Sequence, residues 1–326
     1  MSDNSTLFKY QWNISKLTKN GEVYNFSKGS SEIKVAIIDS GIDYTHENLL
    51  SNIDFQNSRS FVGEHTNIMD YDGHGTMVAG IICGNGILKG VAPNISLIIC
   101  KITDNKKFKL RLFLQAFKYA ISCNVDVINI SLSMFIKTND THLLNIINEL
   151  IEEATNKNIL IITSAGNTKI NLDVHQELHM LGFNPSVYTV AASNKLGKLT
   201  TYSNYSDKCL LAPGGEWFFD TNDPTQVIIT TYPKHLKNMD PLRKNLDLPQ
   251  GYTISYGTSI SCAHFSGTIA LFISYFLELN GEKPSIEIIN YYLKKSYRAK
   301  DENNNCNNLQ EINTYNLLKL LHESIS

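Results

Sequence analysis

Short runs of β-branched and other apolar residues, spaced along most of the chain, restrict the possible folds more than any other feature of this sequence. The runs are Lys34–Asp39, Ser96–Ile102, Val125–Ser131, Ile159–Ser164, Val187–Ala192 and Cys209–Ala212. They do not alternate apolar with polar residues, which is typical of strands that are covered on both faces. Longer amphipathic segments separate them, with predicted helices at His74–Cys83, Leu110–Ser122 and Asp140–Asn156. Strands that alternate with helices predict parallel βαβ units, and therefore an α/β three-layer sandwich with a mainly parallel sheet.

Three polar residues lie where a sheet of this kind places functional sites. Asp39 ends the first strand, His74 begins a helix, and Ser259 begins a long apolar helix. In open α/β sheets, sites form at the carboxyl ends of the strands and at the adjoining helix starts. A serine hydroxyl becomes a nucleophile when an imidazole accepts its proton, and a carboxylate holds that imidazole in the required tautomer. Asn167, in the turn after another strand, carries an amide that can donate to a developing oxyanion.

Each of these residues also has an ordinary structural interpretation. Asp39 fits a turn, His74 a structural histidine at a helix start, and Ser259 a helix N-cap. Asn167 fits an ordinary turn as well. These structural interpretations would have to coincide at four places along one chain, and we therefore favour a catalytic set.

The segments around these four residues form longer motifs. They read VAIIDSGID at Asp39, DGHGTMVAG at His74, SAGN at Asn167 and GTSISCAH at Ser259, with GVAP, INISLS and LAPGG between them. In this order they resemble the motifs of the subtilisin-like serine peptidases, over roughly Ile33–Phe276. The resemblance implies a subtilisin-like sandwich and the hydrolysis of peptide bonds. It makes Ser259 the nucleophile, His74 the base and Asp39 the orienting acid, and it makes Asn167 the oxyanion donor.

The resemblance also implies that a peptide substrate binds as an extra strand between two edge segments. The residues expected to line this strand are Lys106, Lys107, Phe108, Ser131, Leu132, Ser133, Ala165 and Gly166. The two lysines and Lys109 form either a solvated basic loop or an edge that favours acidic residues upstream of the cut. Asp173 and Glu177 are expected near the primary specificity pocket. The polar loop Lys234–Gln250 is a candidate for a further wall of the cleft.

Three departures from the family pattern affect the expected cofactors and domains. Ala263 stands where the family usually has proline. The loop Gly80–Gly90 is short beside that of secreted relatives, so we expect their tight calcium site to be absent and no metal or other cofactor to be needed. Residues 1–32 have room for an N-terminal arm and not for a folded propeptide. We expect residues 33–299 to form the catalytic domain and residues 300–326 a helical cap on it, with a final helix at Leu309–Glu323.

Composition restricts the compartment and the partners. A net charge of −2, with 42% hydrophobic and 18% charged residues, fits a soluble globular protein and favours no nucleic-acid partner. The longest apolar stretch, Gly267–Leu279, is shorter than a membrane span, and the N-terminus lacks an apolar signal segment, so we expect no membrane partner. The cysteines form no CxxC pair, and several lie in apolar runs. We therefore expect buried free thiols and a cytoplasmic location.

A subtilase with neither signal nor propeptide suggests two functions. The short segment before Asp39, the small size and the composition favour similarity to the cytoplasmic peptidases that remove leaders from lanthipeptide (bacteriocin) precursors. The expected partner is then a precursor peptide. An intracellular subtilisin for general protein turnover is the alternative.

Two interpretations from other classes also deserve a test. One is an inactive subtilase scaffold that only binds peptides, and the complete triad argues against it. The other is a nucleotide-binding protein that uses the Gly-rich segment Gly84–Gly90. That segment follows a helix, whereas a dinucleotide fingerprint lies between a strand and a helix. Cys262 and His264, which follow Ser259, are expected to be structural.

Overall fold

The structure, a computed structural model, describes residues 7–104, 108–217, 223–238, 246–297 and 309–324. Its centre is an eight-stranded sheet in the order β12-β9-β8-β6-β4-β1-β3-β2, and every adjacent pair in it is parallel. The strands are β1 (Lys34–Asp39), β2 (Arg59–Ser60), β3 (Ser96–Lys101), β4 (Val127–Ile130), β6 (Leu160–Ser164), β8 (Val187–Ser193), β9 (Leu210–Pro213) and β12 (Gln310–Glu311). The predicted α/β class with a mainly parallel sheet is confirmed.

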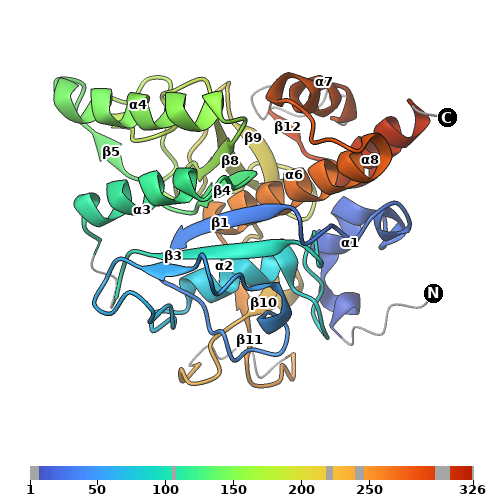
Figure 1. Ribbon diagram of the computed structural model, residues 1–326. Coiled ribbons are helices and arrows are strands. Elements are labelled where there is room, and N and C mark those ends of the chain that lie inside the picture. Colours follow the sequence, from blue (N-terminus) through green and yellow to red (C-terminus); the bar gives the residue numbers. More distant parts are fainter. Residues whose placement is uncertain (1–6, 105–107, 218–222, 239–245, 298–308, 325–326) are drawn as a thin grey trace.

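Helices cover both faces of this sheet (Figure 1). The helices are α1 (Trp12–Thr18), α2 (His74–Cys83), α3 (Leu110–Ser122), α4 (Thr141–Asn156), α6 (Thr258–Asn280), α7 (Ile286–Ser296) and α8 (Thr314–Glu323), with 3₁₀ turns η1 (Phe8–Tyr10), η2 (Glu22–Asn25), η3 (Leu50–Asn52) and η4 (Pro224–Gln226). α2 and α6 pack on one face, whereas α3 and α4 pack on the other. Solvent therefore reaches this sheet mainly at its edges, where the residues proposed for catalysis lie.

Strand β1 shows why the apolar runs are continuous. Its residues Val35 and Ile37 belong to the core under α2 and α6, and Ala36 and Ile38 belong to the core under α3 and α4. Successive side chains of a strand point to opposite faces of the sheet. A strand that is buried on both faces is therefore apolar at each of these positions.

Helix α6 is the central element of the first core. Every residue from Ile260 to Phe276 is buried. By length and composition α6 is apolar enough to cross a membrane, but 94% of its most apolar window is buried inside this protein, as expected of a core helix. It packs against β4, β6, β8 and β9, and its first turn lies at the carboxyl end of β4.

The N-terminal segment and the last strand are joined on one side of the molecule. Lys16 of α1 forms an ion pair with Glu311 of β12 at 2.6 Å, and α1 lies beside α8 (Figure 1). Ile14 and Leu17 of α1 enter the first core. The N-terminal segment is thus packed on the catalytic unit over its described residues.

Two short antiparallel ribbons complete the described structure. β5 (Phe135–Ile136) pairs with β7 (Leu178–His179), and β10 (Ile228–Thr231) pairs with β11 (Tyr252–Ser255). The β10–β11 ribbon packs on α2 and leads into α6.

The expected final helix at Leu309–Glu323 is wrong at its start. Gln310 and Glu311 form β12 and pair with β9, and the helix begins at Thr314, where the Asn313 side chain caps it by accepting from the backbone N–H of Asn316. A two-residue edge strand has no periodicity to reveal it. The sequence analysis also assigned no element to α7, which Ser285 caps at its N-terminus.

Candidate active site

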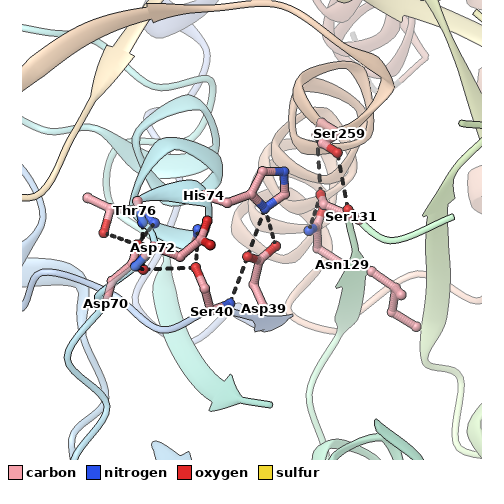
Figure 2. Close-up of polar contacts among 12 residues, drawn as sticks. Asp39, Ser40, Asp70, Asp72, His74, Thr76, Asn129, Ser131 and Ser259 are labelled. Carbon is pink, nitrogen blue, oxygen red and sulfur yellow. Dashed lines mark hydrogen bonds and ion pairs between the residues drawn. The ribbon is translucent and has the colours of Figure 1, made fainter. Parts of the chain in front are cut away.

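The Asp39 carboxylate and the His74 imidazole form a direct hydrogen-bonded pair. Asp39 is the last residue of β1 and is buried, and His74 is the first residue of α2. His74 Nδ1 lies 2.8 Å from Asp39 Oδ1 and 2.9 Å from Oδ2, so Nδ1–H donates to the carboxylate. This contact leaves Nε2 as the proton acceptor. In Figure 2 the imidazole lies between Asp39 and the start of the helix that carries Ser259.

A buried aspartate that the sequence analysis missed fixes the loop before His74. Asp70 Oδ1 accepts from the backbone N–H groups of Asp72 and Gly73, and its Oδ2 accepts from the N–H and hydroxyl of Thr76 (Figure 2). The Ser40 hydroxyl also donates to Asp70, at 2.9 Å. One carboxylate thus joins the turn after Asp39 to the first turn of α2. An acid six residues before a threonine at a helix start is the only signal in the sequence, and it is a weak one.

The glycine beside His74 is required by a close backbone approach. A Cβ atom at Gly75 would lie 2.2 Å from the carbonyl oxygen of Gly41. The backbones after Asp39 and after His74 therefore touch, which sets the separation of the two catalytic candidates. This contact explains the glycine after His74, and Gly41 is further required by its φ of +115°.

The environment of His74 raises its pKa. Burial alone would lower the pKa, but the charge and hydrogen bond of Asp39 raise it more, and the charges of Asp72 and Asp70 add to that effect. The side chain remains 31% exposed. The imidazole is therefore held as a strong base that a substrate can reach.

Ser259 lies in the first turn of α6, after a glycine with an unusual backbone. Gly257 has φ +137°, a conformation that L side chains rarely adopt, and a Cβ there would lie 3.3 Å from Asn167 Nδ2. The Ser259 hydroxyl donates to the carbonyl oxygen of Ser131 at 3.1 Å, and the Ser131 hydroxyl donates to the carbonyl oxygen of Ser259 at 3.2 Å (Figure 2). The end of β4 and the start of α6 are thereby held together.

Asn129, a polar residue inside the apolar strand β4, strengthens that junction. Its Nδ2 donates to the Ser131 hydroxyl at 2.9 Å, and its Oδ1 accepts from the Ser266 hydroxyl at 2.9 Å and from the Cys262 thiol at 3.3 Å. Buried polar groups are normally hydrogen-bonded, so a lone asparagine in a run such as VINI is a signal that sequence reasoning could have used.

The side-chain amide of Asn167 is hydrogen-bonded through its oxygen and not, among the described residues, through its nitrogen. Its Oδ1 accepts from the backbone N–H and the hydroxyl of Thr258, both at 2.9 Å. Among the described residues nothing accepts from its Nδ2, and the side chain is exposed. Asn204, also missed, holds the turn behind it by accepting from the Thr168 and Ile170 N–H groups. A fixed, unused donor beside the start of α6 is suited to bind an oxyanion.

Five of the predicted substrate-binding residues come together beside Ser259. Ser133 donates through its hydroxyl to the carbonyl oxygen of Ala165 at 3.3 Å, and the Leu132 carbonyl accepts from Thr163 at 3.3 Å. The Gly166 N–H donates to the Thr258 hydroxyl at 3.1 Å. With Ser131, these residues bring the chain after β4 beside the chain after β6, at the start of α6.

Of the other predicted edge of the cleft, the structure describes Phe108 and Lys109. Phe108 is partly buried, and its ring lies 6.2 Å from that of Phe113 in α3, so it contributes to the core under α3. Lys106 and Lys107 lie outside the described residues, and Lys109 is exposed. Asp173 is exposed, and its Oδ2 accepts from the N–H of Asp207.

The two residues expected to be structural are buried, and their hydrogen-bond partners are uncharged. Burial raises the pKa of the Cys262 thiol to about 12. Burial also lowers the pKa of His264 to about 4. His264 Nδ1–H donates to the Ile260 carbonyl at 2.9 Å, and its Nε2 accepts from Asn13 Nδ2 at 2.7 Å. Neither side chain is poised for acid–base or nucleophilic chemistry at neutral pH.

The Gly-rich segment after α2 is a loop tied by two side-chain amides. Gln11 Nε2 donates to the Lys89 carbonyl and Gln11 Oε1 accepts from the Lys89 N–H. Asn48 makes the same pair of contacts with Leu88. Within the described ranges, no group of three or more acidic, histidine or cysteine side chains is arranged to hold a metal ion.

A carboxylate-bound histidine beside a serine at a helix start, with a free amide donor next to it, defines a serine peptidase of the Asp–His–Ser class. Residues 30–310 match the model of the subtilase family, peptidase family S8, and this chain belongs to that family. The prediction of a subtilisin-like serine peptidase is confirmed.

Known relatives include leader-processing and intracellular enzymes. The nisin leader peptide-processing serine protease NisP of Lactococcus lactis subsp. lactis is 28% identical over 307 residues, which are 82% of this chain and 44% of NisP. The major intracellular serine protease of Bacillus subtilis (strain 168) is 28% identical over 270 residues, which are 80% of this chain and 74% of that protein. A crystal structure of a lanthipeptide protease matches with TM-score 0.87 and 28% identity, over 97% of this chain and 95% of that one. This chain thus spans less than half the length of NisP.

Proposed function

We propose that this chain is an endopeptidase that cleaves a lanthipeptide-type precursor through an acyl-enzyme on Ser259. The observation that carries the catalytic part is the Asp39–His74 pair, at 2.8 Å, beside a serine held at the start of α6. The orientation of the imidazole leaves its Nε2 to accept the serine proton.

Acylation begins when the Ser259 hydroxyl leaves the Ser131 carbonyl and turns to His74. A bound substrate strand offers its own N–H groups to carbonyls of the Ser131–Ser133 segment, which favours this exchange. Ser259 Oγ attacks the scissile carbonyl while His74 Nε2 takes its proton. Asp39 stabilises the imidazolium that forms. Asn167 Nδ2 donates to the oxyanion, because its Oδ1 is already held by Thr258.

Breakdown and deacylation use the same groups in reverse order. The imidazolium of His74 gives its proton to the leaving amine, and the C–N bond breaks. Water then enters, His74 takes a proton from it, and the hydroxide attacks the acyl carbonyl. Ser259 leaves with the proton from His74, and the carboxylic acid product dissociates.

The leader-removing role is supported by the extent of the structural match. The lanthipeptide protease structure covers 97% of this chain and is itself covered to 95%, so the described elements have counterparts over nearly the whole of both chains. NisP, the nisin leader peptidase, is a relative by sequence. We therefore propose a precursor-peptide leader as the partner.

General protein turnover is the second candidate function. It is favoured by the Bacillus subtilis intracellular protease, which matches this chain at 28% identity over 74% of its own length. The two functions share one site and differ in selectivity, because a leader peptidase cleaves one precursor and a turnover enzyme cleaves many unfolded proteins.

We further propose a cytoplasmic location and no requirement for calcium. The five described cysteines, Cys83, Cys100, Cys123, Cys209 and Cys262, are all unpaired thiols, which suits a reducing compartment. The loop after α2 is held by Gln11 and Asn48, so it has structural support without an ion.

A direct test combines a mechanism-based probe with two substrates. The wild type should react with a fluorophosphonate serine probe, and Ser259→Ala should neither react nor cleave peptides while keeping the wild-type circular dichroism. An unreactive wild type would support the inactive scaffold. The wild type should cleave a lanthipeptide precursor at one site and leave casein largely intact, whereas broad cleavage of casein would favour general turnover.

A further inference from the structure

A pocket separate from the candidate active site lies between the edge strand β2 and helix α3. Its volume is about 540 Å³. It is lined by the aromatic rings of Phe61 and Tyr119 and by the polar side chains of Arg59, His65, Gln115 and Lys118. None of the residues assigned to catalysis or to the substrate strand lines it, so it needs its own explanation.

The aromatic wall of this pocket is held in place by neighbouring groups. The Tyr119 hydroxyl donates to the carbonyl oxygen of Asn57 at 3.0 Å. The edge of the Phe61 ring meets the Tyr119 ring at a centroid distance of 5.7 Å, and the Arg59 guanidinium lies 5.4 Å from the Tyr119 centroid. The two rings and the cation are thus arranged before any ligand binds, which lowers the entropic cost of binding.

The charge at the pocket is positive and uncompensated. Arg59 and Lys118 are exposed, and neither forms an ion pair within the part of the chain that the structure describes. No acidic side chain among the described residues lines the pocket, although the whole chain has a net charge of −2. Such a surface attracts acidic partners.

Neighbouring strands and helix α3 connect the pocket to the candidate active site. Ser60 of β2 pairs with Lys101 of β3, which in turn pairs with Asp39 of β1, so the pocket begins two strands from the catalytic acid. Helix α3 starts after β3 and packs across β3 and β1. The nine residues from Leu110 to Lys118 span about 12 Å of helix. An extended peptide covers that distance with about four residues.

We propose that this pocket is a second binding site for the peptide substrate, which takes an acidic stretch with an aromatic or other apolar side chain upstream of the residues in the catalytic cleft. Carboxylates of that stretch pair with Arg59 and Lys118, and the apolar side chain packs on Phe61 and Tyr119. The proposal rests on the proposed peptidase function and names a part of the substrate that the triad does not contact. A leader remains attached upstream of the cut until cleavage, so it is the part of the substrate that lies on this side of the cleft.

The expected effect lies in binding and not in the chemical step. Pairs between exposed charges are individually weak and are screened by salt. The two cations and the apolar contact together should lower KM by about tenfold at low ionic strength, with kcat unchanged, because the pocket contacts no reacting atom.

The test uses three synthetic fluorogenic peptides that share one cleaved sequence. The first is short and spans only the catalytic cleft. The second extends upstream by ten residues and includes two Asp, one Glu and one Phe. The third has Asn and Gln in place of those acids. For the wild type in 50 mM NaCl, the acidic extension should lower KM about tenfold relative to the short peptide, and the neutral extension should lower it much less. In 500 mM NaCl the advantage should largely disappear.

Two variants with the same loss of charge complete the test. Arg59→Ser combined with Lys118→Ser should lose the gain from the acidic extension and cleave the short peptide like the wild type. Lys294→Ser combined with Lys295→Ser removes two exposed cations from α7, which packs in the other core, and it should keep the gain.

The outcomes separate this inference from the proposed function. If no peptide is cleaved by the wild type, the peptidase assignment fails. If the short peptide is cleaved and the pocket variant keeps the full gain, or the neutral extension gives the same gain, the second site is overturned. It is also overturned if Arg59 and Lys118 prove to bind an oligonucleotide or a second copy of this chain while the peptides show no gain.

Discussion

Two histidines near the start of α6 are held in opposite ways. His74 donates to the Asp39 carboxylate and is surrounded by further acids, and its pKa is raised. His264 is bound by a backbone carbonyl and by the neutral amide of Asn13, and its pKa is lowered to about 4. Burial lowers the pKa of both rings, so the difference comes from the charge of the partner.

The comparison shows how the fold separates catalysis from support. A base needs a partner that stabilises its protonated form, and a carboxylate provides it. A structural histidine needs only fixed hydrogen bonds, and neutral groups provide them without burying a charge.

The two rings also link stability to pH with opposite signs. His74 contributes stability below its ordinary pKa of 6.5, and this is lost as pH rises through its raised pKa. The contribution of His264 is present above 6.5 and is lost as pH falls.

The largest effect should follow from removing the charge of Asp39, the carboxylate that binds His74. Asp39→Asn keeps the shape of the side chain but removes the charge that fixes the tautomer and stabilises the imidazolium. We expect kcat to fall by roughly 10⁴-fold, the loss known for this change in a Ser–His–Asp peptidase. Steady-state kinetics on the short peptide measures it, and a circular dichroism spectrum like that of the wild type is the control for folding. Activity within tenfold of the wild type would refute the role of Asp39.

The converse substitution gives His264 a charged partner, as Asp39 is for His74. In the wild type, the unfolded chain takes up a proton on His264 between pH 6.5 and about 4 that the folded protein does not, so stability falls by about 3 kcal/mol over this range. Asn13→Asp places a carboxylate beside Nε2 and favours the imidazolium, so this fall should become much smaller. Urea unfolding at a series of pH values measures it.

Asn13→Ala is the matched control for that exchange. It removes the hydrogen bond to His264 without adding a charge, and it should cost about 1–3 kcal/mol at neutral pH while keeping the fall toward acid pH. If both variants show the same pH dependence, the partner's charge is not what distinguishes the two histidines.

A smaller effect should follow from removing an outer charge near His74. The charge of Asp72 raises the pKa of His74 and adds to the larger effect of Asp39. Catalysis requires the neutral imidazole, so kcat/KM rises with pH through the pKa of His74 in the free enzyme. Asp72→Asn should move this rise to lower pH by a fraction of a unit, and less so in high salt. A shift to higher pH would contradict the electrostatic account.

The smallest effect should follow from chelation. Because Gln11 and Asn48 hold the loop after α2, EGTA should leave the melting temperature unchanged. Gln11→Ala should lower it, which shows that the assay can detect a loosened loop. A marked drop in melting temperature with EGTA would reveal a calcium site and contradict this prediction.

The sequence predicted those features of this protein that depend on residues close together in the chain. The runs around β1, β3, β4 and β6 are apolar at consecutive positions, and that pattern specifies a doubly covered sheet. The motifs at Asp39, His74, Asn167 and Ser259 combine residue type with turn chemistry, so they could be ordered along the chain without coordinates. The start of α8 was predicted too early, because pairing between β12 and β9 joins residues about 100 positions apart.

By itself, the sequence determined the class of fold, the set of catalytic candidates and their order, because strand patterns and glycine turns are local properties. Only the tertiary structure decided what surrounds them. Asp70 and Asn129 became recognisable as the groups that hold His74 and Ser259 in place, the ring of the partly buried Phe108 was found beside Phe113, and His264 acquired its amide partner. Each of these depends on which segments the sheet brings together, and burial and partner charge then set the properties of the side chain.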